Sequence, residues 1–225
     1  MTAADIEHAS PDVMVRIMAH LLADDLRAQL ARDNAAFLIV TGGTTPAPVF
    51  ALLRNEPLDW AKVTVTLSDE RWVPIDHPDS NERMVRAELL QGPAAAAKFI
   101  SLYRPVKSPS LAAAEVAAAL PKSPGVAILG MGEDGHFASL FPGMAGLDDG
   151  LSLRNPLPCL AVEQPQKGWP RMSLTLGYLT QARMIYLVFS GAAKHALIEN
   201  AARDHLPVAA LLQQQRAPVQ IHWTK

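Results

Sequence analysis

The segment Ala35–Arg54, AAFLIVTGGTTPAPVFALLR, indicates the fold class of this chain. Its apolar start, Ala35–Thr41, predicts a short strand that is covered on both faces. Two glycines follow, and then Pro46, a residue that is favoured at the first position of a helix; the helical pattern runs on to Arg54. A buried strand that turns directly into a helix is typical of α/β proteins with a parallel sheet.

The same alternation recurs along the chain. Further buried strands are predicted at Lys62–Leu67, Gly125–Leu129 and Arg183–Phe189. Helices are predicted at Pro11–Arg32, Pro46–Arg54, Ser80–Leu90, Leu111–Leu120 and Ala192–Arg203. We expect additional strands at Cys159–Val162, Arg171–Leu176 and Val219–Trp223, and loops at Pro105–Pro109 and Pro156–Pro170. No segment resembles an interdomain linker, so the prediction is a single α/β domain over residues 1–225, with a doubly wound, mostly parallel sheet.

Composition limits the classes of function. The chain has 225 residues, of which 49% are apolar and 19% charged, as in an ordinary globular protein. A formal net charge of -2 argues against nucleic acid as a partner. The lone Cys159 lies in an apolar run, which predicts an inert core residue in a reducing compartment. Residues Met1–Glu7 lack the features of a signal peptide, and no apolar run approaches the roughly 20 residues that cross a bilayer. We therefore expect a cytoplasmic protein with no membrane partner.

Glycine-rich or charged segments follow each of the four clearest strands. These segments are GGTTP (Gly42–Pro46), SDER (Ser68–Arg71), GMGEDGH (Gly130–His136) and SGAAK (Ser190–Lys194). In open parallel sheets, ligands bind in the crevice beyond the carboxyl ends of the strands. The four segments are therefore predicted to converge on one site.

The first segment has two interpretations. Gly42 and Gly43 permit positive φ and close approach of a ligand to the backbone. Thr45 is predicted to be the N-cap and Pro46 the first residue of a helix, whose free amides and dipole favour an anion such as phosphate. The alternative is a tight turn between strand and helix that binds nothing. This segment alone does not separate the two.

Two cations fall in the other segments. Lys194 lies in the first turn of its predicted helix, where a positive charge opposes the helix dipole, and this placement favours a role in ligand binding over an exposed surface position. Arg71 directly follows a buried strand. It either forms a surface ion pair with Asp69 or Glu70, or presents its forked donors to a phosphate or carboxylate; its position favours the second.

The segment GMGEDGHFASLFPG (Gly130–Gly143) contains the strongest candidate for chemistry. His136 suits general acid–base catalysis near neutral pH, and Asp134 can orient its ring. A structural histidine is the ordinary alternative. A metal site is disfavoured because no second His or Cys stands at the usual spacing. The remaining histidines lack such a context and are interpreted as structural or surface residues: His8, His20, His77, His195, His205 and His222.

Several catalytic motifs are absent from the sequence. There is no G-x-S-x-G nucleophile elbow, no G-x-G-x-x-G at the start of a helix after the first strand, and no Walker A motif. A serine hydrolase and a nucleotide cofactor are therefore disfavoured. The residues alone predict a phosphate-binding α/β enzyme with a candidate His/Asp base.

Six stretches, in order along the chain, carry a resemblance to a known family. They are TGGTTP (Thr41–Pro46), LSDERWVP (Leu67–Pro74), SNERM (Ser80–Met84), LGMGEDGHFASLFPG (Leu129–Gly143), RMSLT (Arg171–Thr175) and GAAKHAL (Gly191–Leu197). Together they resemble the 6-phosphogluconolactonase family, within the wider group that includes glucosamine-6-phosphate deaminase. Two positions depart from the family pattern: Phe137 replaces a usual threonine, and Thr41 replaces a usual serine. Phe137 is expected to alter a contact beside the base.

The resemblance implies a three-layer α/β/α fold of the NagB/RpiA-like type. It also implies a hydrolase of carbohydrate metabolism, a lactonase that converts 6-phospho-D-glucono-1,5-lactone to 6-phospho-D-gluconate in the oxidative pentose phosphate pathway. No cofactor and no metal are expected. The partner would be this small phosphorylated sugar lactone, and the chain would act as a monomer or a small homo-oligomer.

The resemblance also suggests roles for the candidate residues. His136 would activate a water for attack on the lactone carbonyl, with Asp134 holding the imidazole. The phosphate would be bound by Arg71, Arg171 and Lys194 together with backbone amides of the first glycine segment, that is, of Gly42, Gly43, Thr44 and Thr45. Asn81 either binds sugar hydroxyls or caps a helix.

Two rival functions remain to be weighed. Deaminases of glucosamine 6-phosphate carry a glutamate a few residues after the histidine, but here the aligned residue is Phe141, which cannot transfer protons. A non-catalytic sugar-phosphate sensor would be expected to lack the base, yet His136 and Asp134 are both present. Both rivals are therefore disfavoured.

Overall fold

A parallel β-sheet forms the centre of the molecule. The computed structural model describes residues 3–122, 125–163 and 168–225. Within these residues the main sheet has seven strands, all parallel, in the spatial order β1-β10-β9-β6-β2-β3-β5. The strands are β1 (Ala4–Glu7), β2 (Ala36–Val40), β3 (Val63–Leu67), β5 (Lys98–Ile100), β6 (Val126–Gly130), β9 (Met184–Ser190) and β10 (Val219–Thr224). The four strands predicted most clearly are all present, with ends that differ by one residue.

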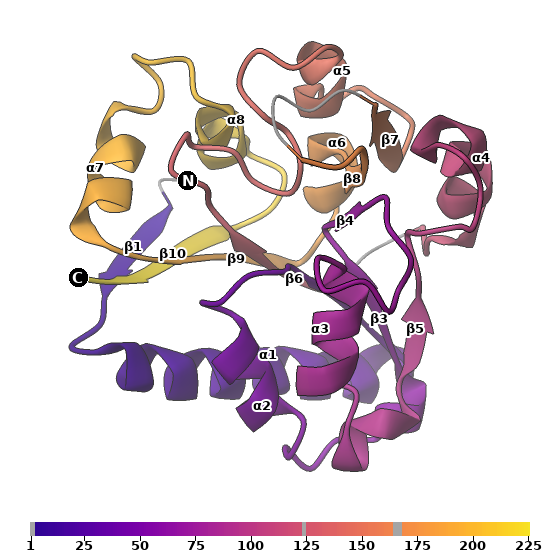
Figure 1. Ribbon diagram of the computed structural model, residues 1–225. Coiled ribbons are helices and arrows are strands. Elements are labelled where there is room, and N and C mark those ends of the chain that lie inside the picture. The colour runs from indigo at the N-terminus through magenta and orange to yellow at the C-terminus, as the bar shows by residue number, and fades with distance from the viewer. Residues whose placement is uncertain (1–2, 123–124, 164–167) are drawn as a thin grey trace.

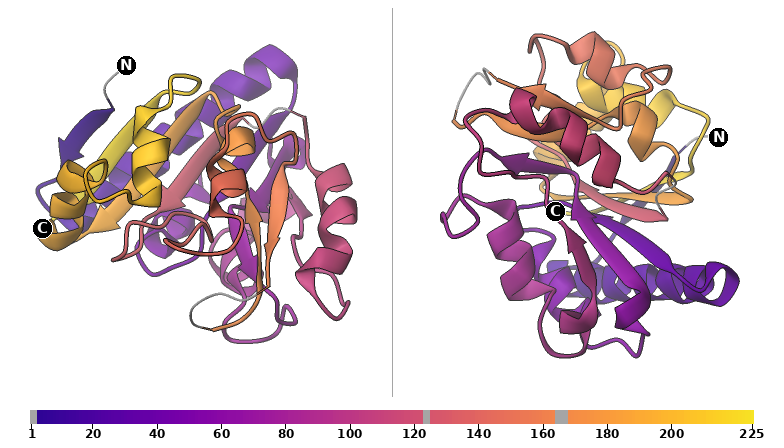
Figure 2. Two further views of the ribbon diagram at one scale, coloured as in Figure 1. Left: turned by 90° about the horizontal axis from the view of Figure 1, so that it is seen from above. Right: turned by 90° about the vertical axis from the view of Figure 1, so that its right-hand side faces the viewer.

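Helices cover both faces of this sheet, so the fold is a three-layer α/β/α arrangement (Figure 1). The helices α1 (Pro11–Asp33), α2 (Ala47–Leu53) and α3 (Asn81–Glu88) lie below the sheet in that view. Above it lie α4 (Pro109–Ala119), α5 (Leu147–Leu151), α6 (Leu176–Leu179), α7 (Ala192–Asn200) and α8 (Pro207–Gln213), as Figure 2 also shows. Two short 3-10 helices are η1 (Trp60–Lys62) and η2 (Gly92–Ala96).

Burial on both faces explains the apolar runs of the sequence. All five residues of β2 are buried, and so are the five central residues of β9. The helix α1 contributes a stripe of buried side chains that packs on the sheet. Ser10 caps α1 by accepting a hydrogen bond from the Val13 N–H at 3.3 Å, and Pro11 occupies its first position.

A second, antiparallel sheet was not anticipated. Its order is β4 (Asp69–Arg71), β8 (Arg171–Leu174) and β7 (Cys159–Val162). The predicted strands at 159–162 and 171–176 therefore belong to this sheet and not to the parallel one, and the second ends at Leu174 because Thr175 caps α6. The predicted loop 156–170 contains β7, and its residues 164–167 lie outside the described residues.

Strand order places the expected ligand crevice. From β2 the chain proceeds to β3 and β5 on one side, whereas from β6 it proceeds to β9 and β10 on the other. The direction reverses between β2 and β6, so the loops that leave their carboxyl ends diverge. A binding site is expected between the segments that follow Val40 and Gly130.

The two ends of the described chain meet in the sheet. β1 lies beside β10 in parallel register, with Ala4 opposite Gln220 and Glu7 opposite Trp223 (Figure 1). β1 was not predicted from the sequence, because the strand has only four residues and is only partly apolar. None of the helices in the described ranges is long and apolar enough to cross a bilayer.

Candidate active site

A cavity of about 160 Å³ lies at the expected switch point. Its wall combines residues that follow β2, β3 and β6 with residues from β8 and α3. They are Thr41, Gly42, Gly43, Asp69, Arg71, Asn81, Gly130, Met131, Gly132, His136, Ala138 and Arg171. Three of the four segments that the sequence singled out thus meet in one cavity.

The imidazole of His136 is oriented by Asp134. The distance from His136 Nδ1 to Asp134 Oδ1 is 2.5 Å, and the same oxygen accepts a hydrogen bond from the His136 N–H at 3.2 Å. Gly135 forms the tight turn between them with φ of 74°. Because Nδ1 is engaged, Nε2 is the ring nitrogen left to act in the cavity, and no other group of the described chain bonds to it.

The electrostatics of this pair favour an ionised carboxylate. Burial alone would raise the pKa of Asp134, but the hydrogen bonds and the charge of His136 outweigh that effect, so the pKa is lowered. An ionised Asp134 fixes the ring orientation and stabilises the imidazolium that forms when His136 accepts a proton.

Gly132 leaves room for the imidazole. A Cβ atom at this position would lie 2.2 Å from both Cε1 and Nδ1 of His136 and 2.8 Å from Oδ1 of Asp134. The backbone of Gly132 also brackets the turn, since its N–H donates to the His136 carbonyl at 2.9 Å and its carbonyl accepts from the Gly135 N–H at 3.2 Å. A side chain here would displace the ring.

Two arginines face the cavity from the antiparallel sheet. Arg71 and Arg171 stand directly opposite each other in the β4–β8 register. The Nε atom of each is buried, and neither has a hydrogen-bond partner within the described chain. Two guanidinium groups with unused donors at the wall of one cavity suit an anionic ligand such as phosphate.

Arg71 does not form the ion pair that was considered for it. Its Nη1 donates to the carbonyl of Asp79 at 2.7 Å, and no ion pair joins it to Asp69 or Glu70 in the described residues. Arg171 instead lies near Asp69, with 3.6 Å between Nη1 and Oδ2. Burial lowers the pKa of Arg171, Asp69 opposes that shift, and the positive charge of Arg71 adds to it.

Asp69 is a site residue to which sequence reasoning assigned no role. Its carboxylate is buried and accepts hydrogen bonds from Ser139 Oγ at 2.6 Å and from Ser68 Oγ at 3.0 Å. Ser139 also lies 3.4 Å from Nη1 of Arg171. The available signal was that both residues stand in the family-like stretches, Asp69 at the end of a buried strand.

Asn81 lines the cavity, and it is not the cap of α3. Ser80 is that cap, accepting from the Arg83 N–H. The Asn81 amide donates to the Asp69 carbonyl at 2.9 Å. Gly42 packs against this amide so closely that a Cβ there would lie 2.0 Å from Asn81 Oδ1. Of the two roles weighed for Asn81, the capping role therefore belongs to its neighbour.

A buried carboxylate supports the start of α3. Glu70 accepts hydrogen bonds from the backbone N–H groups of Arg71, Asn81 and Glu82 at 2.7–2.8 Å and from Ser80 Oγ at 3.0 Å. Burial raises the pKa of Glu70 to about 7, and these hydrogen bonds act against that rise. The carboxylate thereby fixes β4, which carries Arg71, to the helix that carries Asn81.

The first glycine segment reaches the cavity only in part. Gly42 and Gly43 line it, the latter with φ of 108°, whereas Thr44 and Thr45 do not. The predicted N-cap at Thr45 is wrong: α2 begins at Ala47, Pro46 precedes it, and no side chain caps it. The turn uses one residue more than the sequence suggested.

Lys194 lies beside the cavity without lining it. It stands in the first turn of α7, as predicted. Its Nζ donates to the carbonyl of Met131 at 2.9 Å, and Met131 is part of the cavity wall. The fourth segment singled out by the sequence therefore reaches the same edge of the sheet.

Two further expectations concern Phe137 and Cys159. Phe137 is fully buried in the hydrophobic core and does not line the cavity, so the expectation of an altered contact there finds no support in the geometry. Cys159 is buried too, and burial raises the pKa of its thiol to about 12, as expected of an inert core cysteine.

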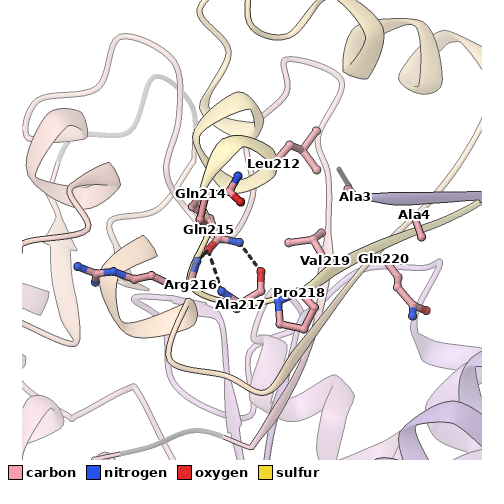
Figure 3. A pocket seen from close by; sticks show the side chains of 10 residues that line it. All are labelled: Ala3, Ala4, Leu212, Gln214, Gln215, Arg216, Ala217, Pro218, Val219 and Gln220. Carbon is pink, nitrogen blue, oxygen red and sulfur yellow. Dashed lines mark hydrogen bonds between the residues drawn. The ribbon is translucent and has the colours of Figure 1, made fainter. Parts of the chain in front are cut away.

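Another cavity, of about 210 Å³, lies at the opposite edge of the sheet, by the amino ends of β1 and β10 (Figure 3). One of its polar side chains, Gln214, is occupied locally: it donates to the Ala217 carbonyl and accepts from the N–H groups of Arg216 and Ala217. No cluster of three or more metal-ligating His, Cys, Asp or Glu side chains occurs in residues 3–122, 125–163 and 168–225.

The switch-point cavity, with two guanidiniums and an imidazole that Asp134 orients, defines the protein as a doubly wound α/β enzyme of the class that acts on small anionic molecules. Residues 9–223 match the family described as glucosamine-6-phosphate isomerases/6-phosphogluconolactonase. The chain belongs to this family.

Relatives and solved structures agree with this assignment. The 6-phosphogluconolactonase of Caulobacter vibrioides is 46% identical over 92% of this chain and 91% of its own length, and that of Pseudomonas aeruginosa is 42% identical over 92% and 89%. The crystal structure of a 6-phosphogluconolactonase from Shewanella baltica superposes with a TM-score of 0.94 at 32% identity, covering 99% of this chain and 98% of that one. A monomeric glucosamine-6-phosphate deaminase shares the fold, with a TM-score of 0.78 at 15% identity over 97% of each chain.

Proposed function

We infer that this chain hydrolyses 6-phospho-D-glucono-1,5-lactone to 6-phospho-D-gluconate, a step of the oxidative pentose phosphate pathway. The relatives that cover most of the chain carry the name of this activity. The observation that bears most directly on the chemistry is that His136, whose ring Asp134 orients, shares one cavity with two arginines. We place the enzyme in the cytoplasm, where its lone buried Cys159 would stay reduced.

His136 acts as the general base in the proposed mechanism. Its Nε2 takes a proton from a water, whose oxygen attacks the lactone carbonyl carbon while Asp134 holds the ring. The tetrahedral intermediate then collapses: the bond between that carbon and the ring oxygen breaks, and the imidazolium returns the proton to the departing oxygen. The new carboxylic acid ionises in water. Backbone N–H groups of the glycine segment at Gly42 and Gly43 are the candidate donors to the oxyanion.

The cations bind the phosphate in this proposal. The free Nε donors of Arg71 and Arg171 support their assignment, because a buried donor without a partner costs free energy until a ligand satisfies it. Lys194 would contribute from the adjoining edge of the cavity, and Asn81 would contact sugar hydroxyls.

The assay compares disappearance of lactone, generated in situ, with and without the protein, because the lactone also hydrolyses spontaneously. A chelator added to one arm tests whether a metal contributes. His136→Ala is expected to lower the catalysed rate on the order of 10²–10⁴-fold. His20→Ala is the matched control, because His20 is exposed on α1. Wild-type turnover by the His136→Ala enzyme would refute the assignment of the base.

A second assay addresses the related deaminase activity. Phe141 occupies the position at which similar deaminases carry a glutamate, so no ammonia is expected from glucosamine 6-phosphate. Release of ammonia at a rate comparable with lactone hydrolysis would overturn the proposed function.

A further inference from the structure

Phe141 contacts two residues of the candidate site although it does not line the cavity. Its ring centroid lies 4.5 Å from that of His136, with an interplanar angle of 48°. The guanidinium carbon of Arg171 lies over the same ring, 5.2 Å from the centroid. The phenyl ring therefore touches both the candidate base and a candidate phosphate ligand.

The backbone around Phe141 holds the ring in place. The preceding turn is closed by the Leu140 N–H, which donates to the Phe137 carbonyl at 3.1 Å. After it, Met144 bonds to Phe141 twice: its Sδ accepts from the Phe141 N–H at 3.3 Å, and its N–H donates to the Phe141 carbonyl at 3.2 Å. These hydrogen bonds fix the backbone of Phe141, and its ring therefore has a defined position relative to its neighbours.

Few other contacts within the described chain fix the position of the Arg171 guanidinium. Its Nε has no partner in the described chain, and its Nη1 reaches Ser139 and Asp69 only at 3.4 and 3.6 Å. A guanidinium over an aromatic face within about 6 Å is attracted by the ring quadrupole. The Phe141 ring thus supplies a contact that the hydrogen bonds of Arg171 leave incomplete.

The same ring bears on the neighbouring imidazole. Arg171 carries five N–H donors, and a donor that reached the imidazole would occupy the lone pair that a base needs. Phe141 offers the guanidinium an apolar π surface in place of that acceptor. It also packs beside the His136 ring, with 4.5 Å between the two centroids, and this contact limits rotation of the imidazole.

We propose that Phe141 is a positioning residue for the hydrolysis: its ring seats the His136 imidazole and the Arg171 guanidinium on one surface and sets the distance between the base and the phosphate. The proposal rests on the function proposed above, in which His136 is the base and Arg171 binds phosphate. It explains why this position is aromatic without requiring the ring to touch the substrate.

Phe141→Leu and Phe141→Tyr test the proposal together. Leucine keeps an apolar side chain but has no π face, whereas tyrosine keeps the ring. For Phe141→Leu we expect KM for the lactone and the inhibition constant of inorganic phosphate to rise about 2- to 5-fold. The kcat should fall on the order of 10-fold, because small misplacements of a reacting group are costly. In Phe141→Tyr the KM, the inhibition constant of phosphate and the kcat should all stay within about 2-fold of the wild-type values.

Phe99→Leu is the matched control. Phe99 also lies under a guanidinium, that of Arg86 at 5.0 Å, but neither residue lines the cavity. This variant should keep the wild-type kcat and KM. Unchanged kinetic constants in Phe141→Leu, or a Phe141→Tyr enzyme as impaired as Phe141→Leu, would overturn the proposal. If Phe141→Leu does not fold, Phe141→Met serves in the same comparison.

A spectroscopic measurement separates this inference from the proposed function. The Phe141 ring current should shift the His136 Cε1–H resonance, and that shift should vanish in Phe141→Leu and persist in Phe141→Tyr. An unchanged resonance in Phe141→Leu contradicts the proposal even if the enzyme is an active lactonase. Full activity of His136→Ala would instead refute the assignment of His136 as the base. In that case the effect of Phe141→Leu on phosphate inhibition would still show whether Phe141 positions Arg171.

Discussion

Gly132 packs directly against the imidazole of His136, so the size of one side chain controls the position of another. In Gly132→Ala the new methyl group would overlap the ring and displace it. We expect kcat to fall about 100-fold, since a misplacement of about 1 Å costs that much. Gly130→Ala is the control, because a Cβ there meets nothing closer than 3.7 Å. Similar kcat values for both variants would argue against the tight placement of the base.

Lys194 is tested by its effect on substrate binding. If it contacts the phosphate, Lys194→Ala removes a charge-assisted hydrogen bond worth about 1.5–3 kcal/mol, and KM should rise on the order of 10- to 100-fold with a smaller change in kcat. Lys62→Ala provides the comparison, since Lys62 precedes β3 at the opposite edge of the sheet. An unchanged KM in Lys194→Ala would return this lysine to a surface role.

At the level of single residues, the sequence predicted which chemical groups would gather, but not how they are held. His136, Arg71 and Arg171 were all identified, and the structure brings them to one cavity, with Asp134, also identified, behind the His136 ring; their chemical roles remain predictions. The support that Asp69 gives to Arg171 depends on the pairing of β4 with β8, two strands that lie about a hundred residues apart in the sequence. Such long-range contacts leave no local pattern in the sequence.

At the level of elements, the junction of β4 and α3 depends on one buried carboxylate. Glu70→Gln would replace one of the two accepting oxygens by an NH₂ group that faces donors from the α3 backbone and Ser80. We expect a loss of about 1–3 kcal/mol in the free energy of unfolding, measured with urea. Glu199→Gln, at an exposed position of α7, should change it by less than about 0.5 kcal/mol. Equal stability of both variants would contradict the proposed role of Glu70.

The elements that the sequence predicted are the long ones with a strong apolar pattern, such as α1, β2 and β9. The strand β4 was missed because Asp-Glu-Arg has little intrinsic preference for a strand, and its extended form is imposed by pairing with β8. The helices α5 and α6 were missed because five and four residues are too few to show a helical period. The start of α2 was predicted one residue too early because the geometry of the preceding turn was inferred from residue types alone.

At the level of the whole molecule, a buried pair of histidines makes stability depend on pH. His8 Nε2 lies 2.9 Å from His222 Nδ1, where β1 meets β10. Burial, with a further contribution from the charge of His8, lowers the pKa of His222 from 6.5 to about 4. The unfolded chain therefore binds a proton more readily than the folded one, so stability is complete above about pH 6.5 and is lost as the pH falls toward 4.

His222→Gln should remove this dependence. Between pH 7 and pH 4.5 we expect the wild type to lose about 2–3 kcal/mol more of its free energy of unfolding than the variant, as measured by urea titration. His20→Gln, which changes an exposed residue of α1, should follow the wild type. If the His222→Gln protein lost as much stability as the wild type, another group would have to account for the acid sensitivity.

The number of domains is also a property of the whole chain. We propose that residues 1–225 form a single domain, since one cluster of buried hydrophobic residues extends from α1 to β10. This remains a prediction. Calorimetry should then record one cooperative unfolding transition, whereas two separable transitions would contradict it.

The position of β10 between β9 and β1 has a consequence for how the protein is synthesised. β1 is made before β10, its partner in the sheet among the described residues, and most of the described chain lies between the two in sequence. Until β10 is made, β1 lacks this partner, and so does the edge of β9 that pairs with β10. Closing the sheet therefore requires a late insertion over a long sequence separation, the kind of step that slows folding. A nascent chain of this protein should accordingly depend more on chaperones than one whose strands pair in the order in which they are made.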